Sequence, residues 1–545
     1  MKYTGISIGP IIRTFDMVRK PRDLWAASYL FSYLMKCICN KIPEGFEIVS
    51  PVVKKSSIPN NVGIYPDRLY VEGEIDSKKI LSEAKEEFIT NTGLSPDSFD
   101  NYFNLMSAVC DSKKDSEAIA DLNQKLDVIE LCNYAADNDA SKSIYNLIIP
   151  GERQASKLYE LATSRKKFKM DTLAEIATVQ LKEDDPEKWK EARDEAKEEE
   201  KVIERFNKGL AKIGKEIPDD LLVNWDDFYA KLSKNFEKVV KGEAGKAKKE
   251  TQLKSYHKYF CVVQADGDNV GKTISHVGLQ NEDVNKISKA LVEFGRKATE
   301  IIECYGGFPV YAGGDDLLFI APVIGKMKKE DASHMNVLEL LNKIEKEAFA
   351  GVSQAVGTTN KGNGIVDNGK KIEASLSFGV SITYYKYPLY EALGSARHLL
   401  FDVAKDKKRF PNKKAVACKL RKHSGGTFEA AFSRVDDDFV GKFSKLIANS
   451  ADGDIVSSIA HKVHQEETIV DMVLDDYMKD GNSKRLDALF EKVLNFDSEK
   501  DAYFKTVKEL MPVLYKEVGK ERFPQALYSI LRIAKFLNGE DLRDE

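Results

Sequence analysis

The chain of 545 residues is 42% hydrophobic and 31% charged, with a formal net charge of −4. This length predicts roughly three or four domains, and the composition is that of a soluble globular protein. The negative net charge argues against a chain that wraps nucleic acid by itself, although basic stretches at 241–254 and 405–422 allow local contacts with an RNA backbone.

The amino-terminal region predicts a small α+β domain. A strand at Tyr3–Ile11 leads to a helix around Trp25–Ile38, and Gly63–Val71 predicts a strand, a turn at Pro66-Asp67-Arg68 and a second strand. The apolar stretch Leu24–Cys39 has 16 residues and contains a lysine. It therefore predicts a buried helix, not a membrane span or a targeting signal, and we expect a cytoplasmic protein.

Helical patterns follow, and within them residues 182–208 alternate in charge. Such alternation is typical of a solvent-exposed helical hairpin or linker. The seven cysteines of the chain contain no Cys-x-x-Cys pair, which indicates reduced thiols and no structural zinc.

The central region predicts a βαββαβ module. A buried strand from Tyr259 runs into Asp266-Gly267-Asp268, and a helix over 284–301 leads to a hairpin. The hairpin strands 308–312 and 317–321 meet at Gly313-Gly314-Asp315-Asp316. A helix over 336–356, a strand over 374–382 and a helix from Pro388 to the basic cluster at Lys405 complete the module, and from 430 onward the pattern is helical again.

The carboxylates of this module predict a metal site. Asp266 and the pair Asp315-Asp316, side by side on adjacent strands, would hold two Mg²⁺ or Mn²⁺ ions about 4 Å apart, the spacing used for in-line phosphoryl displacement. Hard oxygen ligands suit these ions. The predicted catalytic residues are Asp266, Asp315 and Asp316, and Gly267 joins them as a metal ligand.

Further residues predict a nucleotide site around the same turn. Glycines let the backbone approach phosphate closely, and a lysine at the pocket edge supplies a positive charge. Asp268 would be an outer-shell or second metal ligand, and Ser377 would face the base. The predicted nucleotide-binding residues are Gly267, Asp268, Gly313, Gly314, Ser377 and Lys405.

Each motif also has a simpler interpretation. A lone Asp-Gly-Asp or Gly-Gly-Asp-Asp sequence is more often an ordinary solvated turn. A basic cluster at a helix end, such as the one at Lys405, is also favourable with the helix dipole alone. The presence of both acidic motifs at strand exits, separated by one helix, favours the metal site.

Three patches of the chain carry a resemblance to a known family. They are Asp266–Lys272 with Gly313–Asp316 and Tyr387–Arg397, then Ile6–Ile11 with Arg22–Leu30, and finally Lys413–Gly425. The central motifs look like the second Palm domain of the large subunit of type III CRISPR effector complexes. The amino terminus is similar to the first Palm domain of the Cmr-type (III-B) branch, and the last patch resembles the strand that follows the catalytic palm in that branch.

The resemblance implies two ferredoxin-like palms related to nucleotidyl cyclases, with ATP between them. It also implies other Cmr-type subunits, guide RNA and target RNA as partners, and adenylyl transfer to a 3′-hydroxyl that target RNA activates. The product would be a cyclic oligoadenylate or an S-adenosylmethionine–AMP conjugate. Because the first palm keeps only Asp67 at its turn, catalysis would belong to the second palm.

Two further inferences concern domains and alternatives. No histidine precedes His257, so we expect no amino-terminal HD nuclease, which needs histidine ligands. A stand-alone diguanylate or adenylate cyclase and a non-catalytic scaffold remain alternatives. The predicted domains are a degenerate palm at 1–95 that later segments could join, a helical insert at 96–254, a catalytic palm at 255–428 and a helical bundle at 429–545.

Overall fold

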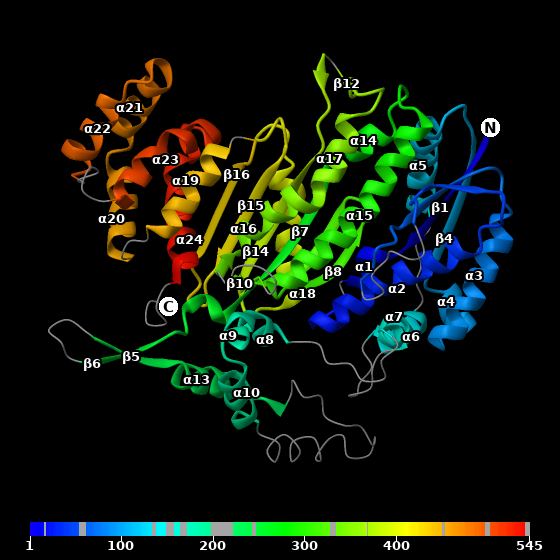
Figure 1. Ribbon diagram of the computed structural model, residues 1–545, viewed down its shortest axis with the longest axis horizontal. Coiled ribbons are helices and arrows are strands. Elements are labelled where there is room, and N and C mark those ends of the chain that lie inside the picture. Colours follow the sequence, from blue (N-terminus) through cyan, green and yellow to red (C-terminus); the bar gives the residue numbers. More distant parts are fainter. Residues whose placement is uncertain are drawn as a thin grey trace.

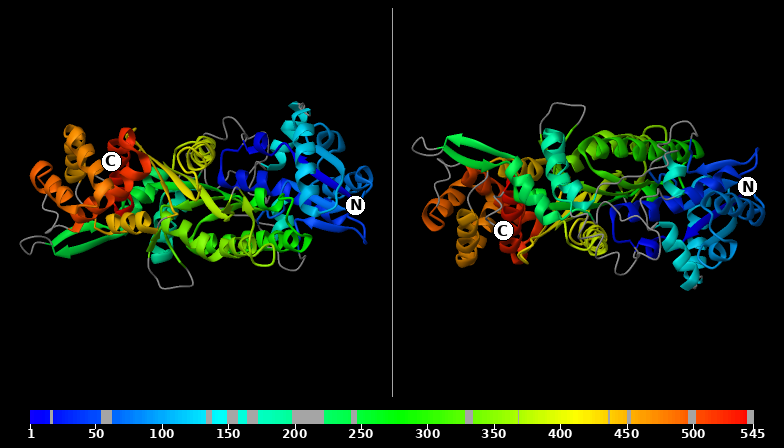
Figure 2. Two further views of the ribbon diagram at one scale, coloured as in Figure 1. Left: turned by 90° about the horizontal axis from the view of Figure 1, so that it is seen from above. Right: turned by 90° about the horizontal axis from the view of Figure 1, so that it is seen from below.

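The computed structural model shows two mixed α+β domains side by side, with an insert below them and a helical bundle at one end (Figure 1). In both further views the bundle and the amino-terminal domain lie at opposite ends of the central domain (Figure 2). Among the described residues, no helix is long and apolar enough to cross a membrane. The structure describes residues 1–15, 18–53, 62–132, 138–148, 157–163, 172–197, 222–241, 247–327, 334–367, 369–435, 437–449, 453–495 and 502–539.

The central domain is built on a six-stranded sheet with the order β16-β15-β14-β7-β9-β8. Strands β14, β7, β9 and β8 and their helices follow the predicted βαββαβ order, so that prediction is confirmed. The strands are β7 (Tyr259–Asp268), β8 (Phe308–Gly313), β9 (Asp316–Pro322), β14 (Ser375–Tyr384), β15 (Ala415–Arg421) and β16 (Thr427–Ser433). The helices that follow them are α14 (Val270–Ile274), α15 (Asn281–Tyr305), α16 (Val337–Lys343), α17 (Ala350–Gly357) and α18 (Leu389–His398).

Helices cover both faces of this sheet. Alternate residues of β7 point to opposite faces, and Cys261 and Val263 belong to the same core as the buried stripe of α15. Phe260 and Val262 instead share a core with the long apolar helix of the amino-terminal domain and with α18. One face of the sheet thus supports its own helices, and the other supports the neighbouring domain.

The amino-terminal domain is the first palm, and it is the smaller of the two. Its four-stranded sheet has the order β2-β3-β1-β4, which is the order of β8-β9-β7-β14 in the larger sheet. The fourth strand lies beyond residue 95, within the range predicted for the insert. The elements are β1 (Lys2–Gly9), α1 (Ile11–Phe15), α2 (Pro21–Asn40), β2 (Glu47–Ser50), β3 (Arg68–Glu72), α3 (Ser77–Thr92), α4 (Pro96–Asp100), β4 (Asn104–Asp111) and α5 (Asp115–Cys132).

The predicted strand, turn and strand over 63–71 is partly wrong. Only its second half forms a strand, β3, which pairs with β2 instead. Gly63 makes a parallel bridge with Tyr311 of β8, and the Ala312 N–H donates to the Gly63 carbonyl at 2.9 Å. The reason is that β8 is the edge strand of the larger sheet and offers free backbone groups. This segment therefore joins the two palms.

A π-helical turn follows α18. Residues Leu399–Ala404 form this turn, η4, and the Lys405 N–H donates to the Leu400 carbonyl at 3.0 Å. In this turn each hydrogen bond spans five residues, not four, so the turn is wider than an α-helical turn. The widened turn ends at the lysine predicted for the nucleotide site.

The insert is mainly helical but ends in a hairpin that was not predicted, β5 (Glu237–Lys241) with β6 (Ala247–Thr251). Its helices are α6 (Asn138–Ile148), α7 (Lys157–Thr163), α8 (Leu173–Ala177), α9 (Val179–Asp184), α10 (Pro186–Glu195) and α13 (Trp225–Asn235). The charged segment 182–208 is not fully exposed, because Trp189 and Ala192 of α10 are buried. Residues 198–208 of that segment lie outside the described residues.

The carboxy-terminal region is a helical bundle, but residues 430–433 are strand, not helix as predicted. Ala430 and Phe432 of β16 are buried against the bundle, and this strand pairs with β15 along its whole length. The bundle therefore begins after Ser433, one strand later than predicted. Its helices are α19 (Asp437–Ala448), α20 (Gly453–Gln465), α21 (Glu467–Asp480), α22 (Ser483–Ala488), α23 (Ala502–Val518) and α24 (Phe523–Gly539).

Candidate active site

The strand register brings the predicted carboxylates to one end of the second palm. Ala265 of β7 pairs with Leu317 of β9, and the Gly267 N–H donates to the Asp315 carbonyl at 3.2 Å. The same antiparallel register places Asp266 beside Asp316 on the adjacent strand. Neighbours of this kind share one face of a sheet, so their side chains lie close together.

Glycine is needed at two positions of this framework. A Cβ at Gly267 would lie 2.6 Å from both Cβ and Oδ2 of Asp315, so only glycine lets that aspartate pack against β7. Gly314 has φ = +64°, the left-handed conformation that a hairpin turn between Gly313 and Asp316 requires. The glycines thus position the carboxylates, whatever else they do.

The carboxylates of the turn and Asp266 repel one another. Burial, together with the charge of Asp266, raises the pKa of Asp315 to about 7. Asp316 has exposed surface at the mouth of the site. The surrounding protein, followed by the charges of Asp315 and Asp266, nevertheless raises its pKa well above the ordinary value. A positive charge at this end of β7 would relieve the repulsion.

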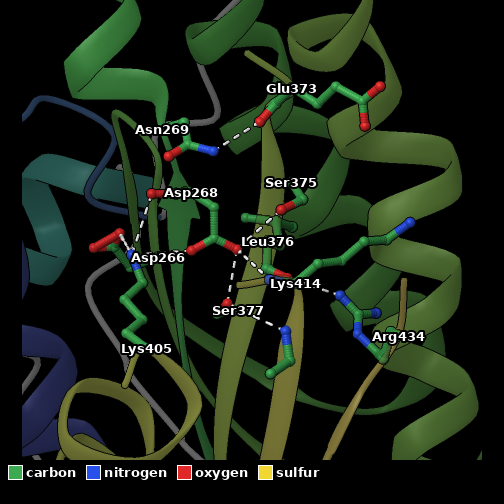
Figure 3. Close-up of polar contacts among 12 residues, drawn as sticks. Asp266, Asp268, Asn269, Glu373, Ser375, Leu376, Ser377, Lys405, Lys414 and Arg434 are labelled. Atoms are coloured by element: carbon green, nitrogen blue, oxygen red, sulfur yellow. Dashed lines mark hydrogen bonds and ion pairs between the residues drawn. The ribbon is translucent and has the colours of Figure 1, made fainter. Parts of the chain in front are cut away.

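One positive charge is supplied by the chain itself. Lys405, at the end of the π turn, has a side chain that is only 13% exposed. Its ammonium donates to Oδ2 of Asp266 and, at 3.2 Å, to the Gly267 carbonyl. It also lies 3.6 Å from Oδ1 of Asp268 (Figure 3). Burial raises the pKa of Asp266, and Lys405 opposes that rise.

Asp268 is fully buried and held from three sides (Figure 3). Its Oδ2 accepts hydrogen bonds from the hydroxyls of Ser375 and Ser377, at 2.9 and 2.7 Å, and from the Lys414 N–H at 3.0 Å. Its Oδ1 has no hydrogen-bond partner. Ser377 is itself buried, and its hydroxyl donates its hydrogen bond to this carboxylate. Both residues therefore belong to a buried anchor beneath the site, not to an open base pocket.

The oxygen donors suit a hard divalent cation. They comprise the Asp266 carboxylate, the Gly267 carbonyl and the two aspartates of the turn, and the raised pKa values indicate negative charge in need of compensation. Within the described part of the chain, no three His, Cys, Asp or Glu side chains already converge in a metal-holding arrangement. The residues fit Mg²⁺ or Mn²⁺ in the chemistry of their oxygen donors.

The first palm contributes a carboxylate that the sequence did not place here. Asp67, at the turn before β3, is near enough to Asp316 for its charge to help raise the pKa of that aspartate. Burial raises the pKa of Asp67 itself. The bridge between Gly63 and Tyr311 explains the proximity, because it fixes the segment before Asp67 beside β8. No motif could reveal this neighbour, since it depends on how the palms pack.

Comparison with known proteins agrees with this architecture. Residues 259–417 match the family described as Cas10/Cmr2, second palm domain, and residues 3–88 match CRISPR-associated protein Cmr2, N-terminal. These two segments are thus similar to two domains of the Cas10/Cmr2 large subunit. The predicted resemblance to this large subunit is confirmed.

Individual Cas10/Cmr2 relatives are distant. The CRISPR system Cmr subunit Cmr2 of Pyrococcus furiosus is 27% identical over 267 residues, which cover 41% of this chain and 28% of that protein. A type III-B Cmr-beta structure in the apo state is 10% identical with a TM-score of 0.49, covering 99% of this chain and 82% of that one. A Csm1–Csm4 cassette in complex with cA4 is 13% identical with a TM-score of 0.48, covering 98% and 69%.

Proposed function

We propose that this chain is an ATP-dependent adenylyltransferase that acts as the signalling subunit of a Cmr-type CRISPR complex. The observation that carries the proposal is the placement of Asp266 beside Asp316, with Asp315 packed against Gly267, in a Cas10/Cmr2 second palm domain. The proposed partners are the other Cmr-type subunits, guide RNA and target RNA, because the Pyrococcus relative is named as a subunit of the Cmr system.

Each group at the site has a proposed role. Asp266, Asp315, Asp316 and the Gly267 carbonyl would hold Mg²⁺ or Mn²⁺. The two ions would supply charge neutralisation and activation of the attacking 3′-hydroxyl. The backbone at Gly313 and Gly314 would receive the triphosphate, and at Gly314 a Cβ would meet nothing within 4 Å.

The rest of the fold would orient the substrate and exclude water. The two palms are joined by the backbone bond between Ala312 and Gly63 and by a shared apolar core, so the site lies against a second domain. A nucleotide held between them would be shielded from bulk water, which strengthens each ionic contact with its phosphates. We propose nucleotide binding by the first palm, through its face beside β8, and no chemistry there.

The test is product formation by the assembled complex with target RNA and labelled ATP. Asp316→Asn, which keeps the size of the side chain and removes its charge, should lower the rate by roughly 10²-fold or more. Asp402→Asn is the matched control, since this exposed carboxylate on the π turn pairs with His398 and does not reach the site. Unchanged product from an Asp315→Asn, Asp316→Asn double variant would favour a scaffold instead.

Two additional arms define the reaction. Parallel incubations with and without S-adenosylmethionine separate a cyclic oligoadenylate from a conjugate, because only the second product requires that compound. Incubation of the isolated chain without RNA or other subunits tests the stand-alone cyclase. Full activity in that arm would contradict the proposed dependence on target RNA.

A further inference from the structure

Lys405 occupies the oxygens that a metal ion would need. Its ammonium donates to the Asp266 carboxylate and to the Gly267 carbonyl, and these are two of the four proposed metal ligands. An ammonium and a divalent cation sharing these oxygens would repel strongly, because two like charges about 4 Å apart interact by several kcal/mol at the dielectric of a partly buried site. The lysine and the metal ion are therefore alternatives at this position.

The position of the ammonium is built into the fold. The backbone N–H of Lys405 is bonded across the π turn to the Leu400 carbonyl, and only 13% of the side chain is exposed. By contrast, the neighbouring Lys407 and Lys408 are exposed. Widened turns of this kind often mark functional positions in helices. Here the turn directs Lys405 inward, whereas Lys407 and Lys408 of the same basic cluster remain in water.

A second carboxylate, that of Asp268, is placed to accept the ammonium of Lys405 if a metal ion displaces it. Oδ1 of Asp268 is buried, has no hydrogen-bond partner and already lies 3.6 Å from the Lys405 ammonium. A buried carboxylate oxygen without a partner is costly and gains from each charged donor that reaches it. The other oxygen of Asp268 is fixed by Ser375, Ser377 and the Lys414 N–H, so this carboxylate cannot turn away.

We propose that Lys405 is a placeholder cation of the metal site. In the metal-free chain its ammonium neutralises Asp266, and metal binding displaces it to Oδ1 of Asp268, which makes Asp268 a positioning residue for the lysine. This inference rests on the proposed function, since it assumes that Asp266 binds the metal ion. The free energy that Lys405 contributes to the metal-free site is subtracted from the affinity for the metal.

The test measures Mn²⁺ binding by the full chain without nucleotide. Binding is detected as the loss of the electron paramagnetic resonance signal of free Mn²⁺. Lys405→Met should tighten Mn²⁺ binding about tenfold, the equivalent of one lost charge-assisted hydrogen bond. Lys413→Met is the control, because this partly buried lysine acts on Asp266 and Asp268 through space and donates no hydrogen bond to either. Its removal should change the affinity by about threefold or less.

A double-variant cycle identifies the receiving carboxylate. Asp268→Asn should weaken Mn²⁺ binding in the parent chain, since the displaced ammonium would lose its second position. The same substitution in the Lys405→Met background should weaken binding less, because no ammonium has to move. Equal effects in both backgrounds would overturn the assignment of Asp268.

The remaining outcomes separate this inference from the proposed function. If the parent binds Mn²⁺ and Lys405→Met gains no more affinity than Lys413→Met, the placeholder role is overturned and the metal site stands. If neither the parent nor any variant binds Mn²⁺, the metal site itself is overturned and the proposed function falls with it. Lys405→Gln, which is neutral and polar, replaces Lys405→Met if thermal unfolding shows that the methionine variant does not fold.

Discussion

The two palms share a strand order but differ in charge at equivalent positions. In the first palm, Ser7 of β1 pairs with Arg68 at the start of β3. In the second palm, the same register places Asp266 beside Asp316. One framework thus carries serine and arginine where the other carries two aspartates.

The arginine of the first palm is already neutralised within its own domain. Arg68 donates to Asn123 at 2.8 Å, to Asp127 at 2.6 Å and to Glu130 at 3.1 Å, and the Ser7 hydroxyl also donates to Glu130. In the second palm, by contrast, the three carboxylates of Asp266, Asp315 and Asp316 share the positive charge of one lysine, Lys405. The comparison teaches that the palm fold supplies a position for charge, and that the local balance of charge decides whether a cation is needed there.

The largest expected effect comes from the carboxylates themselves. Asp266→Asn should lower product formation by roughly 10²-fold or more, because it removes a ligand charge at the reacting centre. Asp67→Asn, the corresponding loss from the first palm, should change the rate by less than about threefold, since it would only weaken the field at Asp316. Rates of the assembled complex with labelled ATP measure both. Equal losses would break the distinction between the palms and make the site a shared one.

The next effect is on stability, and it compares the two buried networks. Asp268→Ala should lower the free energy of unfolding by about 3 kcal/mol, because two hydroxyls and a backbone N–H lose their acceptor in the interior. Arg68→Ala should cost about 1 kcal/mol and less at high salt, since Asp127 is mostly exposed. Urea unfolding at low and high salt measures both, and a salt-sensitive loss at Asp268 would contradict its buried position.

The last expected effect is a pH dependence that arises where the second palm contacts the insert. Burial, followed by the charge of His334, lowers the pKa of His257 to about 3. Its ring accepts from the Lys254 N–H at 2.9 Å and contacts the Gln180 side-chain oxygen at 2.7 Å, an arrangement that suits neutral imidazole. Gln180 also contacts His334 and Asp184, the other titratable groups of this network.

The sign follows from these pKa values. An unfolded histidine has a pKa of about 6.5, so the unfolded chain binds the proton first and stability is lost as the pH falls below that value. The loss from this group should approach about 2 kcal/mol near pH 5 and be absent in His257→Leu. Urea midpoints between about pH 7.5 and 4.5 measure it. A slope as steep in the leucine variant would assign the loss to other groups.

Local patterns in the sequence predicted the second palm well. The apolar runs at 259–263 and 317–321 and the glycines after the helix determine strands and turns through neighbours only a few residues away. The first palm was harder to predict. Gly63 pairs with an edge strand almost 250 residues later in the chain, and no local pattern encodes such a partner.

The sequence singled out the residues of the candidate site but not their contacts. Asp266, Asp315 and Asp316 stand at strand exits, which the sequence displays directly. Ser377 looked accessible because it alternates with apolar residues, yet it is buried, with its hydroxyl between Asp268 and the Ala415 N–H of β15. The ammonium of Lys405 depends on a π turn, which differs from an α-helix by one hydrogen-bond step that composition does not reveal. The absence of an HD nuclease stays a prediction.

That π turn makes the aim of Lys405 a matter of how the chain winds. A π turn accommodates one residue more than the α-helix around it. Each residue of an α-helix advances the direction of its side chain by about 100°, so the same residues wound as an ordinary helix would point Lys405 away from Asp266. Deletion of one exposed residue such as Phe401 would instead let the ordinary helix continue, with the Lys405 N–H still bonded to the Leu400 carbonyl. The position of the lysine should thus tolerate a deletion in this turn better than an insertion.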